Sequence, residues 1–236
     1  MAGIAVLVGC TSTVDGVAHR RDAVRGGGDL AEVLPTDDEA ARAVGNPLPD
    51  TSRPISGGIE VLPNGIRDNR AASPIECLGA VSPFMRVVYE TGDVRAAAWQ
   101  EFSNYGGGQV VSSVNAGVVA FADGAQAQQM FGGFTDRWKA CEGTTVTTAL
   151  HDSANTELYQ KVTAVTVNGP LVSATVENSD NQGDAMFPTE RAIGLAVDCV
   201  VDVDVAVTAG PPDRQRAGGR AVALAETMLE KAGARR

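Results

Sequence analysis

Residues 191 to 208 carry the longest strand signal in the chain, because apolar and polar side chains alternate along them. Alternation with a period of two is typical of a β-strand with one buried face, since successive side chains point to opposite sides of a sheet. The predicted core face carries Val197, Cys199, Val201, Val203, Val205 and Val207. The opposite face carries Asp198, Asp202 and Asp204, which we predict to be exposed to solvent.

Other parts of the chain also predict strands. Residues 94 to 103 and 110 to 122 are rich in Val, Ala, Phe and Trp without helical spacing, which favours two strands. Residues 162 to 167 alternate, and the Asn-Gly pair at 168 and 169 predicts a tight turn into another strand over 171 to 176. The second half of the chain therefore contains at least one β-hairpin.

Capping signals predict two short helices in the first half. Thr36 precedes three acidic residues, which favour a helix N-terminus, and Gly45 can end that helix. Ser73 and Glu76 have the spacing of a capping box and predict a second helix that runs through Cys77. We expect irregular chain between these two helices.

Three further helices complete the prediction. A short one spans about 82 to 89, a long one follows Asp123, and a closing one follows the two prolines near residue 212. The long helix has one apolar face made of Ala127, Met130, Phe131, Phe134, Trp138 and Cys141. The closing helix has a buried stripe of Val222, Ala225, Met228, Leu229 and Ala232. Helices that flank an antiparallel sheet predict an α+β fold.

The charge balance limits the possible partners. The chain has 29 acidic and 19 basic residues and a net charge of −10. Such a charge opposes binding to nucleic-acid phosphates and to anionic lipid headgroups, so we expect no nucleic-acid partner. No apolar run reaches the roughly 18 residues that a spanning helix needs, so we expect no passage across a bilayer.

The first ten residues form a short apolar run that ends in Leu7-Val8-Gly9-Cys10. This ending resembles the lipobox of bacterial lipoproteins, in which a signal peptidase cuts before the cysteine and the thiol carries a diacylglycerol. The resemblance implies a lipid anchor on Cys10. A complete export signal also has a basic segment and a longer apolar stretch, which leaves open that the true start lies upstream of Met1. The alternative is a cytosolic N-terminus with an incidental cysteine.

The chain after the cysteine divides into two parts. Residues 11 to 29 contain few large apolar side chains and a run of three glycines, which predicts a flexible tether. Residues 30 to 236 are expected to form the folded domain. Residues 1 to 10 are then a partial lipoprotein signal.

Three cysteines remain once Cys10 is set aside. Cys77 and Cys141 lie at the ends of apolar helices, whereas Cys199 occupies an inward strand position among valines. In an oxidising compartment this favours a disulfide between Cys77 and Cys141, worth about 4 kcal/mol in the chain-entropy model. The alternative is three reduced cysteines in a cytosolic protein.

Catalytic and metal-binding patterns are sparse. His19 lies in the tether, and His151 lies beside Asp152 in a predicted turn, where a solvated imidazole is favoured over a general base. No Gly-x-Ser-x-Gly, Cys-x-x-Cys or His-Glu-x-x-His sequence occurs. Asp202 and Asp204 are roughly 7 Å apart on a strand, so they could hold a cation only with other ligands. We therefore expect no catalytic residue, metal or cofactor.

Four stretches together resemble the PknH-like extracellular domain family, which includes the sensor of a mycobacterial serine/threonine kinase and related lipoproteins. They are residues 34–39, residues 74–80, residues 121–141 and the segment from Glu190-Arg191-Ala192 to residue 203. The resemblance implies a sensor-type domain in the periplasm or cell wall, with a sheet and helices that form a cleft for a ligand. It also implies the Cys77–Cys141 disulfide and a free Cys199. The family's second disulfide aligns with Thr189 and Ala206, which are not cysteines.

Two hypotheses follow for the function. The first is a lipid-anchored, non-catalytic binding or sensing module whose partner is a small molecule, a cell-wall component or an envelope protein. The second is an envelope hydrolase with an unrecognised active site. A purely structural envelope protein is a third possibility. Kinase activity is not implied, because the chain has no Gly-rich loop, catalytic lysine or His-Arg-Asp sequence.

Overall fold

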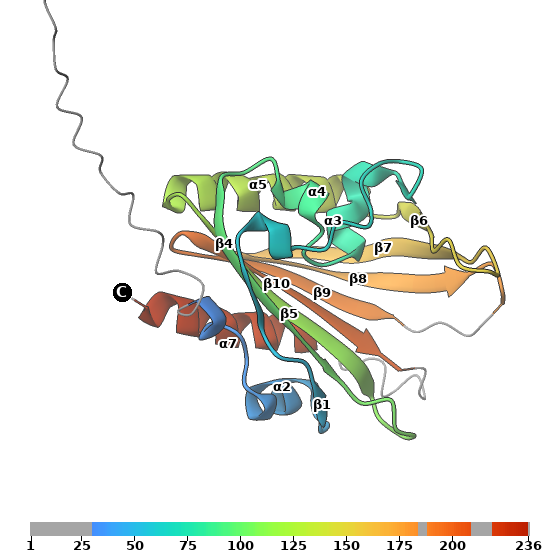
Figure 1. Cartoon of the computed structure of the whole chain (residues 1–236), viewed down its shortest axis with the longest axis horizontal. Coiled ribbons are helices and arrows are strands. Elements are labelled where there is room, and N and C mark those ends of the chain that lie inside the picture. The colour runs from blue at the N-terminus through green and yellow to red at the C-terminus, as the bar shows by residue number, and fades with distance from the viewer. Residues whose placement is uncertain (1–29, 184–187, 209–218, 236) are drawn as a thin grey trace, which may run out of the picture.

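One large antiparallel sheet organises the computed structural model, which describes residues 30–183, 188–208 and 219–235 (Figure 1). Its strands follow the order β1-β4-β5-β10-β9-β8-β7-β6-β3, and β2 pairs with β4. They are β1 Asp50–Thr51, β2 Ile55–Gly57, β3 Ala72–Ser73, β4 Val94–Ser103, β5 Val111–Phe121, β6 Thr145–Ala149, β7 Glu157–Asn168, β8 Leu171–Asp180, β9 Thr189–Ala196 and β10 Cys199–Val207. The predicted α+β fold is confirmed.

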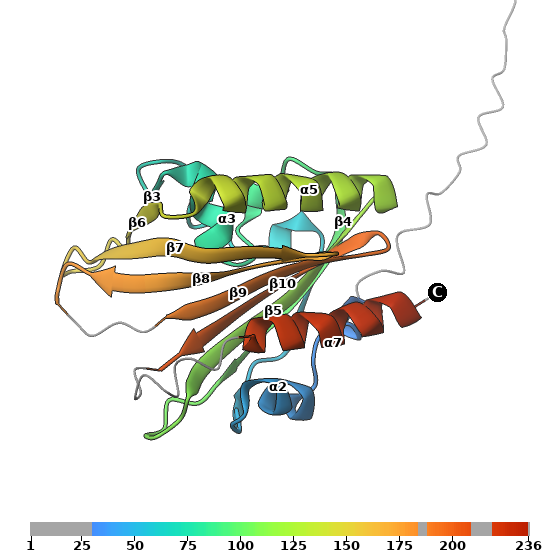
Figure 2. The ribbon, with the colours of Figure 1, turned by 180° about the vertical axis from the view of Figure 1, so that it is seen from behind.

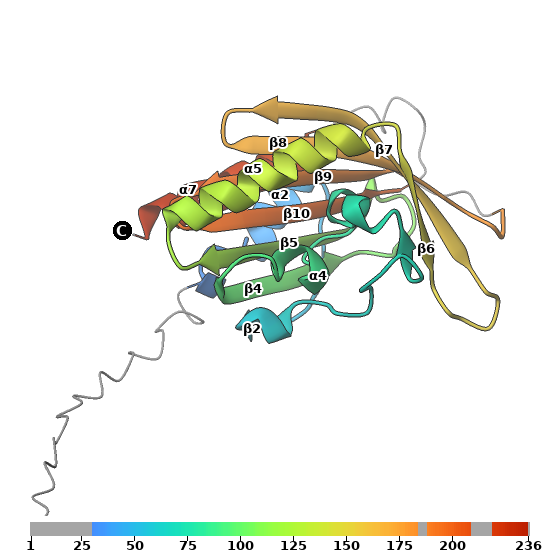
Figure 3. The same cartoon turned by 90° about the horizontal axis from the view of Figure 1, so that it is seen from above.

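Helices cover both sides of this sheet (Figures 1, 2 and 3). They are α2 Asp37–Val44, α3 Leu78–Val81, α4 Arg86–Tyr89, α5 Gly124–Cys141 and α7 Arg220–Ala234, with the 3-10 turns η1 Ile59–Val61 and η2 Ile75–Cys77. The side that α3, α4 and α5 cover is called the α5 face below, and the side that α2 and α7 cover is called the α7 face.

The two faces have cores of different composition. The core of the α7 face is almost entirely aliphatic, and Phe102 is the one aromatic residue among its described buried members. The core of the α5 face holds most of the buried aromatic side chains, namely Phe84, Tyr89, Phe121, Phe131, Phe134 and Trp138. All six residues predicted for the apolar face of α5 are buried.

The strands predicted in the middle of the chain are confirmed, with one shift. β4 and β5 pair over nearly the whole of the predicted ranges. β7 and β8 form the predicted hairpin, but Asn168 and Leu171 are Cα partners, so the turn residues are Gly169 and Pro170. Gly169 has a φ of 57°, a left-handed conformation that glycine adopts without strain.

The prediction of one long strand over 191 to 208 was wrong, because the segment is a hairpin. Ala196 and Cys199 are Cα partners, which leaves Val197 and Asp198 as a two-residue turn between β9 and β10. Val197 is 49% exposed and has a φ of 50°. The alternation of side chains continues through the turn, so the pattern alone does not reveal the reversal.

The prediction of a solvent-exposed aspartate face on this segment was also wrong for two of its three members. Asp202 and Asp204 are only 1% and 8% exposed. β10 lies between β5 and β9 near the middle of the sheet, and both of its faces are covered. Asp198 is exposed, because it belongs to the turn.

The two predicted capping boxes had different outcomes. At α2 the box is present: Glu39 donates its amide to Thr36 Oγ1 at 3.3 Å, and the Thr36 amide donates to Glu39 Oε2 at 2.8 Å. At Ser73 it is absent, because Ser73 belongs to β3 and pairs with Thr147 of β6. The helical segment there begins as η2 without a side-chain cap.

Candidate functional site

Arg191 and Asp202 form an ion pair that is enclosed on the α5 face. Arg191 Nη2 lies 2.9 Å from Asp202 Oδ1, and the two side chains are 0% and 1% exposed. The residues come from neighbouring central strands, β9 and β10. Taking two charges out of water costs several kcal/mol per ion, so such a pair is stable only when further hydrogen bonds satisfy both groups.

Those hydrogen bonds come from the segment that contains α3 and α4. Arg191 donates to the carbonyl oxygen of Gly79, in α3, at 3.1 Å. Asp202 Oδ2 accepts from the Phe84 amide at 3.1 Å and from the Tyr89 hydroxyl at 2.8 Å. Burial and the neighbouring Asp202 carboxylate raise the pKa of Tyr89 well above its ordinary value. The ion pair therefore pins this segment to the sheet at two points.

Close packing fixes the same segment against β5. Phe84 has a φ of 56°, which is unusual for an aromatic residue. Its ring lies against Gly117, where an added Cβ would be 2.6 Å from Phe84 Cε1. It also stacks on Trp99, with ring centroids 6.1 Å apart. A glycine at position 117 is therefore what allows the ring to reach the sheet.

Helix α5 is joined to this assembly by two contacts near its C-terminal end. The Trp138 ring lies 5.6 Å from Cζ of Arg191. Cys141 forms a disulfide with Cys77, at the end of η2. Cys199 is buried in the α7 core and is not bonded to another cysteine, and burial together with the nearby Asp198 carboxylate raises the pKa of its thiol to about 12.

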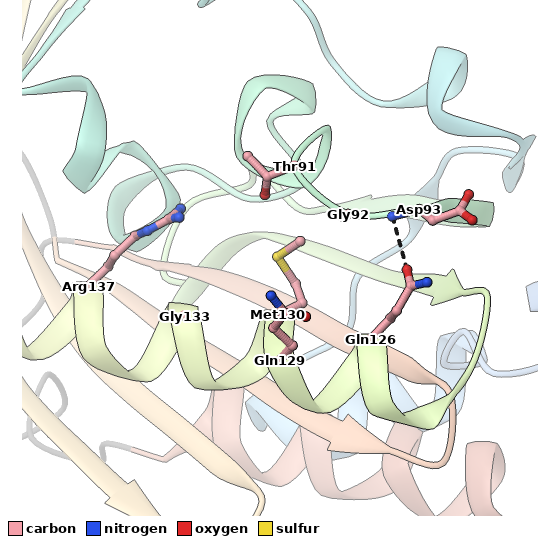
Figure 4. A pocket seen from close by; sticks show the side chains of 8 residues that line it. All are labelled: Thr91, Gly92, Asp93, Gln126, Gln129, Met130, Gly133 and Arg137. Atoms are coloured by element: carbon pink, nitrogen blue, oxygen red, sulfur yellow. Dashed lines mark hydrogen bonds between the residues drawn. The ribbon is translucent and has the colours of Figure 1, made fainter.

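A pocket of about 550 Å³ opens between α5 and the segment that follows α4 (Figure 4). Its lining residues are Thr91, Gly92, Asp93, Gln126, Gln129, Met130, Gly133 and Arg137. The pocket thus lies at the seam between the two pieces of chain that cover the α5 face. Both pieces are anchored to each other and to the sheet by the contacts described above.

The floor and one end of the pocket are well defined. The Asp93 amide donates to Gln126 Oε1 at 3.2 Å, which closes the seam at the start of α5. Met130 forms the apolar floor and is 9% exposed. At Gly92 an added Cβ would lie 2.8 Å from Met130 Cε and 2.9 Å from Phe121 Cε1, so close packing requires glycine there.

Arg137 supplies the cationic group of the pocket. Its side chain extends from α5 toward Thr91 on the opposite wall (Figure 4). Within the part of the chain that the structure describes, Arg137 forms no ion pair or hydrogen bond. The acidic member of the lining, Asp93, is paired with Arg95 at 2.7 Å. The pocket therefore presents one unpaired positive charge.

Asp204 is the second buried carboxylate on the α5 face. Its Oδ1 accepts from Asn115 Nδ2 at 3.2 Å. Burial raises the pKa of Asp204 to about 6, although the nearby Arg191 guanidinium acts in the opposite direction. A carboxyl group that is buried with a single hydrogen-bond donor in this way favours its neutral form.

The histidine and the turn carboxylate at 151 and 152, which the sequence offered as candidate groups, do not line this pocket. His151 is exposed at a φ of 53°, and Asp152 accepts hydrogen bonds from the amides of Ala154 and Thr156 within the same turn. Those bonds lower the pKa of Asp152. Among the described residues, no group of three His, Cys, Asp or Glu side chains is placed to hold a metal ion. Cys10 and His19 lie outside the described residues.

The family assignment agrees with this arrangement. The sequence profile of the PknH-like extracellular domain matches residues 26–231. The chain belongs to this family. The crystal structure of the extracellular domain of PknH from Mycobacterium tuberculosis has the same fold, with a TM-score of 0.73 at 21% identity over 88% of this chain and 96% of that one. A Mycobacterium smegmatis structure covers 84% of this chain and 96% of its own at 11% identity, with a TM-score of 0.37. No curated protein matches the chain significantly.

Two features that accompanied the family resemblance now have a structural explanation. In the PknH-like stretch at 190–192, Arg191 forms the buried ion pair, and Glu190 accepts hydrogen bonds from the amides of Arg220 and Ala221 at the start of α7. Thr189 and Ala206, to which the resemblance assigned the positions of a second disulfide, are Cα partners on β9 and β10.

Neither the ion pair nor the pocket is predicted by the sequence. The partner of Asp202 lies on another strand, so no local pattern identifies it. The pocket joins two segments that are more than thirty residues apart. One local signal was available: Gly132 and Gly133 stand together inside an amphipathic helix, where glycine is unfavourable.

Proposed function

We propose that this chain is an exported, lipid-anchored module of the cell envelope that binds or senses a ligand and does not catalyse a reaction. Membership of an extracellular domain family supports the exported setting. The binding function is carried by the pocket at the α5 seam, where an unpaired guanidinium, side-chain amides and a hydroxyl surround an apolar floor. Small-molecule sites commonly combine a concave, partly apolar surface with a few convergent polar groups.

The size of the pocket favours a small molecule over the other partner classes. Its volume of about 550 Å³ lies within the range of roughly 300–1,000 Å³ that is usual for small-molecule sites. A soluble fragment of the cell wall would fit the same space. An envelope protein would need a much larger contact surface than this pocket offers.

The chemistry of the lining favours binding over catalysis. Hydrolysis usually needs a general base that acts together with a nucleophile, a second acid or a metal. Asp93, the carboxylate among the lining residues, pairs with Arg95 at 2.7 Å, and the lining residues include no histidine, cysteine or second carboxylate. The remaining polar lining groups are amides and a hydroxyl, which donate and accept hydrogen bonds, and a guanidinium, which only donates them. An envelope hydrolase remains the alternative that the experiment below must reject.

The proposed anchor is a diacylglycerol on Cys10. No helix among the described residues is long and apolar enough to span a membrane. Mass analysis of the mature N-terminus should find a diacylated Cys10. An unmodified N-terminus would remove the anchor from the proposal and leave the binding function to be tested separately.

The binding function is tested by thermal melting of the full chain with fractions of an envelope extract. We expect at least one small-molecule fraction to raise the melting temperature, and no turnover in a broad hydrolase panel. Gly133→Gln, which places a side chain in the pocket, should abolish the rise. Gly132→Gln is the matched control and should retain it. Turnover that a single substitution removes would establish the hydrolase instead.

A further inference from the structure

We propose that the pocket at the α5 seam binds a small anionic sugar, either a sugar phosphate or a sugar acid, and that Arg137 holds its anionic group. This inference rests on the binding function proposed above and adds the chemical class of the ligand. Three observations lead to it: an unexplained glycine on the pocket wall, an unpaired guanidinium one helical turn away, and the hydrogen-bonding groups between them.

Gly133 is the first observation. Glycine inside a helix is unfavourable, and it is usually explained by close packing. At Gly92, on the other wall, packing does explain it, since an added Cβ would lie 2.8 Å from Met130 Cε. At Gly133 an added Cβ would meet no atom within 4 Å, and the same holds for its neighbour Gly132, so close packing requires neither glycine. Of the two, Gly133 lines the pocket, so the free space beside its backbone is pocket space that a ligand can occupy.

Arg137 is the second observation. It follows Gly133 by four residues, so both lie on the same side of α5. Its guanidinium has no partner among the described residues and extends across the pocket (Figure 4). A planar guanidinium with several donors is well suited to a carboxylate or phosphate group, which it can bind through two parallel hydrogen bonds.

The remaining lining groups favour a hydroxylated body for the ligand. Gln126 and Gln129 present amides that both donate and accept hydrogen bonds, and Thr91 presents a hydroxyl on the facing wall. Met130 offers an apolar patch that can cover one face of a sugar ring. The paired Asp93 carboxylate, at the opposite end from Arg137, can accept hydrogen bonds from hydroxyl groups and disfavours a second anionic group.

Calorimetric titration of the full chain with three probes tests this assignment. The probes are glucose 6-phosphate, glucuronate and glucose, which share a ring and differ in charge. We expect at least one anionic probe to bind with a Kd on the order of 1 mM or tighter, as the usual free energy per heavy atom gives for a ligand of this size. Glucose should bind at least tenfold more weakly. The preferred anionic probe decides between a phosphate and a carboxylate source.

Four variants separate binding from stability. Arg137→Gln should weaken the anionic probe about tenfold and leave glucose unchanged within twofold. Lys139→Gln removes a charge of the same sign from the same helix outside the lining and should leave all three probes unchanged. Gly133→Gln and Gly132→Gln should both raise the melting temperature by a few degrees, because each replaces a helix glycine. Only Gly133→Gln should abolish binding.

Equal binding of glucose and the anionic probes would overturn the inference, and so would an anionic probe that binds Arg137→Gln as tightly as the wild type. The absence of binding by either anionic probe would overturn it too. In that case a melting-temperature rise with an envelope fraction, lost in Gly133→Gln, would keep the binding function and reject only the ligand class. If no fraction has an effect, the binding function itself fails.

Discussion

The two faces of the sheet are closed by different kinds of interaction. On the α7 face, α7 packs an aliphatic core against β9 and β10, and α2 packs on α7. A buried ion pair between Glu190 and Arg220 lies at the start of α7, at the edge of this core. On the α5 face, two separate pieces of chain share the covering role, and an ion pair, a disulfide and stacked aromatic rings hold them in place. The pocket lies between these two pieces.

This difference explains why the pocket lies on the α5 face. Aliphatic burial is non-directional and strong, so it can close a face without fixing the exact spacing of the elements above it. A seam that must keep a defined width needs directional contacts. The ion pair and the disulfide provide them, because both require particular distances between atoms of the sheet, the α3–α4 segment and α5.

Among the substitutions that test this difference between the faces, removal of Arg191 should lower the free energy of unfolding most. Arg191→Met leaves the Asp202 carboxylate buried without its counter-ion, and we expect the free energy of unfolding to fall by about 3–5 kcal/mol. Denaturant unfolding measures this change. The double variant Arg191→Met/Asp202→Leu should lose distinctly less, because no uncompensated charge remains. A loss below about 1 kcal/mol for the single variant would contradict the enclosed ion pair.

Removal of the disulfide should have the next largest effect. Cys77→Ala/Cys141→Ala releases a crosslink between residues 64 positions apart, and we expect a loss of about 2–4 kcal/mol. Cys199→Ala is the control on the α7 face. It removes one small buried thiol and should cost about 1 kcal/mol. Similar losses for the two variants would show that the crosslink does not stabilise the α5 face more than ordinary packing does.

The buried Asp204 on the α5 face should make the stability of the domain depend on pH. Its pKa is raised from 3.8 to about 6, so the folded state holds this proton more tightly than the unfolded state between those values. The contribution of Asp204 to stability is therefore largest below pH 4, falls as the pH rises to about 6, and stays low above that. The fall should be on the order of 2 kcal/mol.

Asp204→Asn removes the titrating carboxyl group and so tests this prediction. The stability of the variant relative to the wild type should increase from pH 4 to pH 7 by the same amount, in denaturant titrations at both pH values. Asp198→Asn is the matched control for an Asp-to-Asn change in the same hairpin, because Asp198 is exposed in the turn between β9 and β10. A flat profile for Asp204→Asn would mean that its carboxylate is solvated.

The sequence predicted best those features whose determinants lie within one element. The apolar face of α5 follows from helical spacing, and the cap of α2 follows from Thr36 and Glu39, three residues apart. The exposure of Asp202 was predicted wrongly, because a polar side chain on a strand can face either water or a buried partner. That partner, Arg191, is identified only when β9 and β10 are known to be neighbours.

The pocket also could not be predicted from the sequence of a single element. Its walls come from the segment at 91–93 and from α5, which the fold brings together, and neither segment contains a recognisable binding pattern. The turn at Val197 could not be predicted for a related reason, since its side chains continue the alternation of the strands on either side. Pairing between distant segments is decided by tertiary packing, which periodicity within a segment does not report.

Glu190 allows the most direct comparison between the faces, because it precedes Arg191 in β9 and points to the opposite side. Its substitution should have the smallest effect on the free energy of unfolding. Its carboxylate accepts from the amides of Arg220 and Ala221 at 2.6 and 3.3 Å, and so caps α7, whose N-cap residue Gly219 has no side chain to do so. The same carboxylate pairs with the Arg220 guanidinium at 2.6 Å. Glu190→Gln keeps an acceptor there but removes the charge, so we expect a loss of about 1–2 kcal/mol. Denaturant unfolding beside Arg191→Met tests this. If Glu190→Gln cost as much as Arg191→Met, the α7 face would depend on a buried charge as strongly as the α5 face does, and the contrast between aliphatic closure and directional closure would not hold.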